Sequence, residues 1–173
     1  MSQSSKKKSD PSALSIPDRR RFATELALRL LSRREHTGLE IRHKLSEKGF
    51  DPDTIAVTVL ELEKSGLLSN ARYAEAFARE AGERRGFAPA EVRRRLRSRG
   101  VDPEMAAQST AISPEDEVER AKAVGAQRAR SLRSYPKDVQ FRRLVGFLSR
   151  RGYPPSVVSR VATELIGSHG EDS

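Results

Sequence analysis

The chain has 173 residues, with 33 Lys and Arg against 24 Asp and Glu, which gives a formal net charge of +9 and a pI of about 10.3. It has no Cys, so disulfides, thiol catalysis and thiolate metal sites are excluded. Aromatic residues make up 5% of the chain and Trp is absent, so a ring platform for stacking bases would have few members. No apolar run approaches the roughly 18 residues of a membrane span, and we predict a cytoplasmic protein with anionic partners.

The positive charge is spread unevenly along the chain. Residues 21–68 carry 8 basic and 8 acidic side chains, whereas residues 69–113 carry 9 and 6 and residues 114–173 carry 11 and 8. Residues 1–20 carry 5 and 2. The basic surface therefore comes from the N-terminal tail and the last two thirds of the chain. Because the first 17 residues are rich in Ser, Lys, Asp and Pro and poor in apolar side chains, we expect a disordered tail there.

Helix signals follow one another closely in chain order. Thr37 and Glu40 have the spacing of a capping box at a helix start, and Gly49 supplies a left-handed stop nine residues later. Asp51 and Pro52 then begin the next helix, with a capping carboxylate followed by proline at the first helical position. Similar signals predict helices over residues 18–35, 38–48, 52–65, 69–85, 88–98, 103–111, 114–131, 137–150 and 155–167.

One pattern occurs three times, in EIRHKLSEKGFDPDTI (40–55), EVRRRLRSRGVDPEMA (91–106) and RLVGFLSRRGYPPSVV (143–158). Each segment has an apolar residue, a Leu four positions later, a Gly four positions after that, and then an apolar residue and a Pro. The glycines, Gly49, Gly100 and Gly152, are 51 and 52 residues apart. A period this constant indicates tandem structural units.

Each unit also has a predicted helix ahead of this segment, so we predict an all-α chain of three tandem three-helix repeats. The predicted repeats cover residues 18–68, 69–112 and 113–167, with disordered residues 1–17 and 168–173 at the ends. Because each short repeat contacts chiefly its neighbours, we expect an elongated, curved, solenoid-like body. No heptad pattern suggests a coiled-coil dimer, and we predict a monomer.

Arginines dominate the candidate binding surface. In the second helix of repeats two and three, the apolar stripe leaves nine arginines largely outside: Arg93, Arg94, Arg95, Arg97, Arg99, Arg142, Arg143, Arg150 and Arg151. The planar guanidinium can form paired hydrogen bonds to carboxylate or phosphate, so we predict contacts with an acidic protein surface, with DNA phosphate, or with both. A solvated helix face is the simpler alternative.

Other charged groups have plainer explanations. The corresponding helix of the first repeat has a mixed face that is typical of an ordinary solvated surface, with Arg42, His43, Lys44, Glu47 and Lys48. Lys6, Lys7 and Lys8 are compatible with either a phosphate-binding arm or a solubilising tail.

The sequence gives little support for an enzymatic function. There is no GxxxxGK[ST] or GxGxxG phosphate loop, and the three His have no zinc-binding spacing. Acidic groups such as Glu115, Asp116 and Glu117 are typical of a helix start. We therefore predict a protein that is not an enzyme and that uses no cofactor or metal.

The order and spacing of several segments resemble the RecX family, regulators of the RecA recombinase. These segments are ALRLLSRREHTGLEIRHKLSEKGF, LEKSGLLSNARYAEAFARE, RRGFAPAEVRRRLRSRGVDP and FRRLVGFLSRRGYPPSVV. The resemblance covers residues 20–165 and departs from the usual pattern at Asn70, at Ala88 and Pro89, and at Pro154.

The resemblance implies three three-helix units and a regulatory function in DNA repair and the SOS response. It implies that the chain binds RecA, lies in the groove of the RecA filament on DNA, and inhibits the ATPase, recombinase and coprotease activities of RecA without catalysis or a cofactor of its own. An elongated body could bridge neighbouring recombinase subunits and hold them in one arrangement. Groove blocking and filament-end capping both remain open at this point.

Two other functions are compatible with the residues alone. Short consecutive helices joined by a Gly turn also suggest a free-standing DNA-binding protein of the helix-turn-helix type. An inert scaffold with a solvated basic face is the third possibility.

Overall fold

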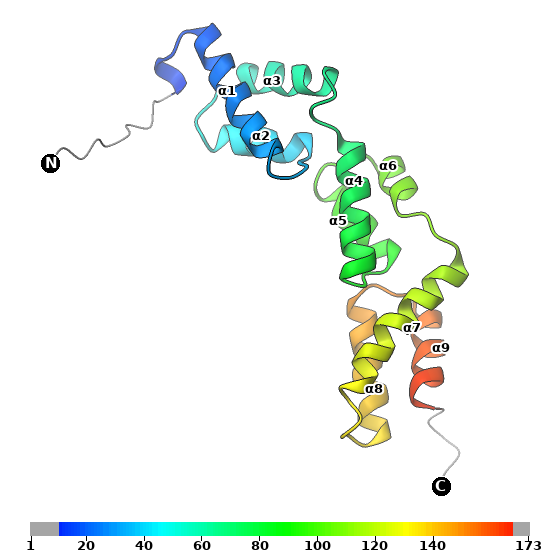
Figure 1. The fold of residues 1–173 in the computed structure, drawn as a ribbon. Coiled ribbons are helices and arrows are strands. Elements are labelled where there is room, and N and C mark those ends of the chain that lie inside the picture. Colours follow the sequence, from blue (N-terminus) through cyan, green and yellow to red (C-terminus); the bar gives the residue numbers. More distant parts are fainter. Residues whose placement is uncertain (1–10, 168–173) are drawn as a thin grey trace, which may run out of the picture. The chain divides into compact units, whose positions relative to one another are not determined.

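A computed structural model describes residues 11–167, and it contains helices and no strands over that range (Figure 1). The chain divides into two compact units, residues 1–73 and residues 74–173. The first unit holds η1 (Pro11–Ala13), α1 (Ile16–Leu31), α2 (Gly38–Ser46), α3 (Pro52–Lys64) and the start of α4 (Asn70–Arg79). The second holds the rest of α4, η2 (Glu80–Arg84), α5 (Pro89–Arg97), α6 (Pro103–Ser109), α7 (Pro114–Arg130), α8 (Lys137–Arg150) and α9 (Pro155–Ile166).

The helix starts follow from the capping residues that the sequence places there. Thr37 Oγ1 accepts a hydrogen bond from Glu40 N at 3.1 Å, and Asp51 Oδ1 accepts one from Thr54 N at 2.9 Å. Ser113 caps α7 in the same way, with Asp116 N as the donor. Each bond satisfies one of the backbone donors that a helix start leaves unpaired. The predicted all-α fold of three-helix repeats is confirmed, and every predicted helix is present, with ends within a few residues of the predicted ones except at the end of α4.

The first repeat has its own apolar core. Helices α1, α2 and α3 pack on one another around Ala27, Ile41, Leu45, Val59 and Leu62, each of which is buried. Ile41 and Leu45 are one helical turn apart on α2, so they lie on the same side of that helix. Their burial is the reason that the charged side chains between them face outward.

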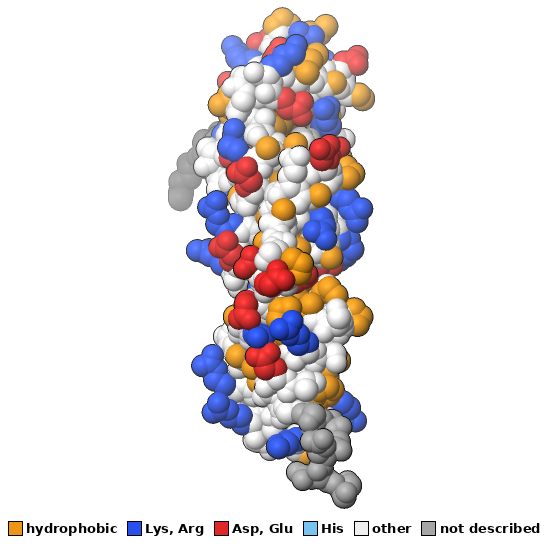
Figure 2. Space-filling model, turned by 90° about the vertical axis from the view of Figure 1, so that its right-hand side faces the viewer, with side chains coloured by type: hydrophobic (Ala, Val, Ile, Leu, Met, Phe, Trp, Pro, Cys, Tyr) orange, Lys and Arg blue, Asp and Glu red, His pale blue; other side chains and the backbone are white. Residues whose placement is uncertain are grey.

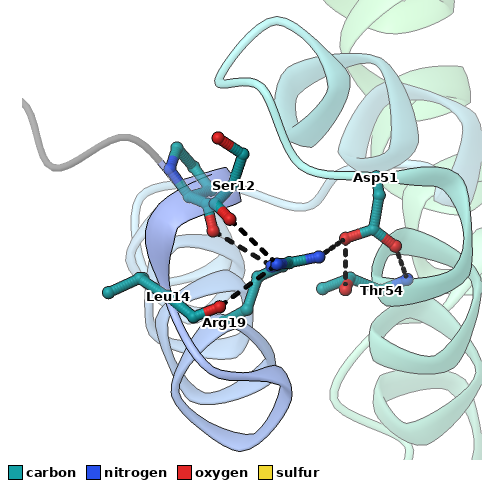
Figure 3. Close-up of polar contacts among 6 residues, drawn as sticks. Ser12, Leu14, Arg19, Asp51 and Thr54 are labelled. Atoms are coloured by element: carbon teal, nitrogen blue, oxygen red, sulfur yellow. Dashed lines mark hydrogen bonds and ion pairs between the residues drawn. The ribbon is translucent and has the colours of Figure 1, made fainter.

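Residues 11–17 differ from the predicted disordered tail. Pro11–Ala13 form a turn of 3₁₀-helix, and α1 already begins at Ile16. The guanidinium of Arg19 donates to the carbonyl oxygens of three residues of this segment, Pro11, Ser12 and Leu14, and also to Asp51 Oδ2 at 2.8 Å (Figure 3). The sequence missed this element because its stability comes from a tertiary contact and not from local propensity. Residues 1–10 and 168–173 of the predicted tails lie outside the described residues.

The second unit contains the remainder of repeat two and all of repeat three. In repeat three, α7, α8 and α9 pack around Ala121, Leu144, Leu148, Val158 and Val161. The core of repeat two is thinner, with Val92 and Leu96 of α5 buried beside Ala106 of α6. This difference follows from the sequence, because α6 has seven residues and supplies one fully buried side chain.

Repeats two and three meet within the second unit through backbone as well as side chains. Ala88 N, just before α5, donates to Arg151 O at the end of α8 with a length of 2.9 Å. Ala88 is fully buried and belongs to the same apolar cluster as the core of repeat three. The start of α5 is therefore fixed to the end of α8.

A π-helical turn, η2, follows α4 where the sequence predicts a continuous helix to residue 85. Gly82 lies in this turn, and an added Cβ there would stand 2.7 Å from Arg120 Nη1 of α7. A turn of this kind is uncommon and marks a local departure from the helical hydrogen-bond pattern. None of the described helices is long and apolar enough to cross a membrane.

Candidate anion-binding surface of the second unit

The arginines of α5 fall into two groups. Arg94 and Arg95 both bind Glu91, one turn back on the same helix, with Nε to carboxylate distances of 2.8 and 2.7 Å. The bonds from Arg94 and then Arg95 lower the pKa of Glu91 to about 2, against an opposing effect of burial. The carboxylate therefore stays ionised and neutralises part of this face. Arg97 is exposed, and its side chain forms no hydrogen bond or ion pair among the described residues.

Arg93 and Arg99 turn toward neighbouring elements. Arg93 Nη1 donates to Thr110 Oγ1, just after α6, at 3.3 Å. Arg99 lies with Cζ 4.7 Å from the ring centroid of Phe77 on α4, and its Nη1 donates to Arg95 O. Both side chains are half-buried, so they contribute less to an accessible surface than the sequence suggests.

The arginines of α8 are more exposed. Arg142 forms a weak ion pair with Asp138 at 3.7 Å, and Arg143 Cζ lies 4.0 Å from the ring centroid of Tyr135. Arg150 is exposed and has no ion-pair partner within residues 11–167. Three guanidinium groups of this helix are thus accessible to an external anion.

Three arginines and two phenylalanines alternate across the junction of repeats two and three. Cζ of Arg95 lies 3.8 Å from the centroid of Phe87, and Cζ of Arg151 lies 5.8 Å from the same ring. Arg151 is also 3.9 Å from the centroid of Phe147, which Arg128 approaches at 5.7 Å. We call these five residues the arginine ladder.

The arginine ladder brings several positive charges close together. Burial lowers the pKa of Arg151, and the nearby charges of Arg128 and Arg150 lower it further. Arg128 Nε is buried and has no hydrogen-bond partner among the described atoms. Glu91 neutralises Arg95, but no carboxylate of the described residues forms an ion pair with Arg128 or Arg151.

A stacked guanidinium keeps its N–H edges available. The ring contacts one face of the planar group and fixes its orientation, while the donors in the plane can still bind an anion. In Arg151, Nε already donates to Arg85 O at 3.2 Å, which leaves the two Nη groups for an external partner. The arrangement can therefore bind phosphate or carboxylate with groups that are already positioned.

The structure brings only some of the nine predicted arginines close together. Arg95 and Arg151 both approach the ring of Phe87, although they belong to different repeats. Arg128, Phe87 and Phe147 were missed, because each is an ordinary residue in its own segment and no local spacing links the three. Within the described residues, Phe87 and Phe147 are each contacted by two arginines, a relationship visible only in three dimensions.

His36 and His43 both lie in the first unit. His43 of the mixed α2 face is exposed and lies 3.3 Å from Glu47. His36 is buried, with Nδ1 2.8 Å from Glu40 Oε2. Lys6, Lys7 and Lys8 lie outside the described residues, and residues 11–167 hold no group of three potential metal ligands.

Comparison with known proteins identifies all three repeats. Models of the first, second and third three-helix domains of RecX match residues 23–62, 69–109 and 115–162 in that order. The regulatory protein RecX of Amycolatopsis mediterranei is 32% identical over 94% of each chain, and that of Corynebacterium efficiens is 34% identical over 84% of this chain and 72% of its own. The crystal structure of RecX from Lactobacillus salivarius has a TM-score of 0.74 at 19% identity and covers 86% of this chain and 97% of that one, a likeness of fold.

Proposed function

Because the chain belongs to the RecX family of regulatory proteins, we propose that it binds the RecA recombinase and its nucleoprotein filament. In this proposal it inhibits the ATPase, recombinase and coprotease activities of RecA in DNA repair and the SOS response. It acts in the cytoplasm as a monomer without catalysis of its own. Family membership supports the regulatory role, and the arginine surface of the second unit supports an anionic partner.

The two units differ in net charge, and this difference supports a contact with an anionic partner mainly through the second unit. Residues 11–73 carry 11 basic and 9 acidic side chains, whereas residues 74–167 carry 19 and 12. Figure 2 shows one face of the molecule, and near its lower end, where repeat three lies, blue Lys and Arg side chains stand apart on white and orange surface. An acidic surface of the recombinase or DNA phosphate would therefore meet the second unit.

Inhibition follows if the chain binds one arrangement of recombinase subunits better than the arrangements needed for turnover. A ligand can shift a conformational equilibrium only by its difference in affinity for the two states. Contacts with two neighbouring subunits provide such a difference, because the spacing of the subunits changes the fit of the bound chain. ATP hydrolysis slows as a consequence.

The test replaces four accessible arginines of the candidate surface, Arg94, Arg97, Arg143 and Arg150, by Ala. We expect weaker inhibition of RecA ATPase on single-stranded DNA, with an unchanged far-UV circular dichroism spectrum. If DNA phosphates are among the contacts, affinity for the filament also falls with salt, by about 0.7 to 0.9 log units per log unit of salt for each phosphate.

A variant of equal charge loss in the first unit is the control, with Ala at Arg20, Arg29, Arg33 and Arg42. All four side chains are exposed. Full inhibition by the second-unit variant would exclude these arginines as the contact. Tight binding to naked duplex DNA without any effect on RecA would instead support a free-standing DNA-binding protein.

A further inference from the structure

Repeat three has a small cleft at one end. The arginine ladder, at the junction with repeat two, lies at the opposite end of the repeat. The cleft is formed where the end of α7, the start of α8 and the end of α9 meet, and Figure 1 shows these three helix ends at the same end of the repeat. Its volume is about 370 Å³. This is near the lower limit of roughly 300 Å³ for ligand pockets and suits one or two side chains better than a cofactor.

All of the charged side chains that line the cleft are positive. Arg130, Arg133 and Lys137 line it, and no carboxylate does. Each of the three cations is exposed, and its side chain forms no hydrogen bond or ion pair with another described residue. By contrast, Lys122 of the same repeat binds both Glu119 and Glu164, at 3.1 and 2.9 Å.

Local helix electrostatics explain one of these cations and leave another unexplained. Arg130 is the last residue of α7, where a positive charge is favourable beside the negative end of the helix dipole. Lys137 is the first residue of α8, where the same effect is unfavourable. A charge in this position therefore does not serve the stability of its own helix.

The floor of the cleft is aliphatic. Ala129, Leu165 and Ile166 line it, and all three are half-buried and pack against the apolar core of repeat three. An apolar side chain placed there would extend that core and lose its contact with water. The lining contains no aromatic ring, so it offers no stacking surface for a nucleic-acid base.

From this combination we infer that the cleft binds an acidic peptide segment of a partner protein, with one apolar side chain on the aliphatic floor and carboxylates on the three cations. The inference goes beyond the proposed RecA contact, because none of the cleft residues belongs to the arginine ladder or to the four arginines of the RecA test. A cation rim around an apolar centre is also the arrangement expected of a small protein-binding site.

The test uses the full chain and a fluorescein-labelled probe peptide, Asp-Glu-Asp-Leu-Glu-Asp-Glu, in fluorescence anisotropy. We expect saturable binding that weakens about tenfold when Arg133 and Lys137 are both changed to Glu. The control carries Glu at Arg33 and Arg160, two exposed residues outside the cleft, and has the same change in net charge. It should bind within about twofold of the unchanged protein.

A second peptide with Ser in place of Leu keeps the carboxylates and removes the apolar side chain, so it measures the contribution of the aliphatic floor alone. We expect it to bind about tenfold more weakly. Equal losses in the two charge variants would overturn the inference, as would equal affinity for the two peptides. Displacement of the probe by a single-stranded oligonucleotide that responds to the same variants would identify a nucleic-acid site instead. The four arginines of the RecA test, Arg94, Arg97, Arg143 and Arg150, all lie outside the cleft, so their substitution by Ala should leave peptide binding unchanged. The peptide test can therefore fail without affecting the proposed RecA function.

Discussion

Gly152 lies directly against Glu91 at the junction of repeats two and three. A Cβ atom added to residue 152 would stand 2.6 Å from Glu91 Cβ, closer than side-chain carbons approach in proteins. Gly152 also has a φ of +86°, a conformation that other residues adopt at a cost. Gly49, its equivalent in repeat one, has a φ of +85°, but the nearest atom to its added Cβ is Pro11 Cδ at 3.8 Å.

Substitution of Gly152 by Ala should therefore cost more than the same change at Gly49. For Gly49→Ala we expect a loss of about 1 to 2 kcal/mol in the free energy of unfolding, from the left-handed conformation alone. For Gly152→Ala the collision with Glu91 adds about 1 to 3 kcal/mol. Urea unfolding followed by circular dichroism measures both values. Equal losses would show that Glu91 can move away from the added methyl group without a loss of stability.

This pair of glycines also shows what the sequence can and cannot predict. The repeated pattern predicts a left-handed turn at both positions, because a turn depends on local residues and recurs with the period. The contact of Gly152 with Glu91 joins residues 61 positions apart and has no local signal. The helix ends were predictable for the same reason that the turns were, and the arginine ladder was not, because its members come from different helices and loops.

Glu91 should make stability sensitive to acid. Its pKa in the folded chain is about 2, below the ordinary value of roughly 4.3, because it accepts hydrogen bonds from Arg94 and Arg95. A depressed pKa stabilises the fold fully above about pH 5, and this contribution is lost as the pH falls toward 2. Because Arg94 is largely exposed and solvent screens the pair, we expect about 1 kcal/mol.

The test is Glu91→Gln, which should lower the free energy of unfolding at pH 7 and lose most of this difference near pH 2. Glu75→Gln is the control, since Glu75 is exposed and forms no ion pair within the part of the chain that the structure describes. A constant difference between Glu91→Gln and the unchanged protein across this pH range would contradict the assignment. Because the change frees two arginines, filament binding should also tighten if α5 is part of the contact.

The arginine ladder should contribute a measurable coupling between Arg151 and Phe147. Stacking of a guanidinium on a ring stabilises by about 0.5 to 2 kcal/mol, depending on how far the pair is removed from water. Phe147→Leu removes the ring and keeps an apolar side chain, and Arg151→Met removes the charge and keeps a long one. We expect the double variant to be more stable than the sum of the single losses predicts, by about 0.5 to 1 kcal/mol.

The matched cycle pairs Phe147→Leu with Arg142→Met, because Arg142 is exposed on the same helix and has Asp138 as its partner. That cycle should show additive losses within about 0.5 kcal/mol. Similar coupling in both cycles would mean that the ring affects α8 as a whole and not through Arg151.

His36 should make stability depend on pH in a second, separate range. The residue is 4% exposed, and burial is the largest cause that lowers its pKa, against an opposing hydrogen bond to Glu40. The ring therefore takes up a proton at lower pH in the folded chain than in the unfolded chain, where histidine titrates near pH 6.5. Since the unfolded state then binds more protons, stability falls as the pH drops from about 7 to 5.

Substitution of His36 by Gln should remove this slope between about pH 7 and 5 while the carboxylates remain ionised. The readout is the change in the urea midpoint with pH, so a constant loss of stability in the variant does not disturb the comparison. His43→Gln is the control, because the His43 side chain is 74% exposed and lies on the outer face of α2. The same slope in the His36 variant as in the unchanged protein would exclude burial of this ring as its source.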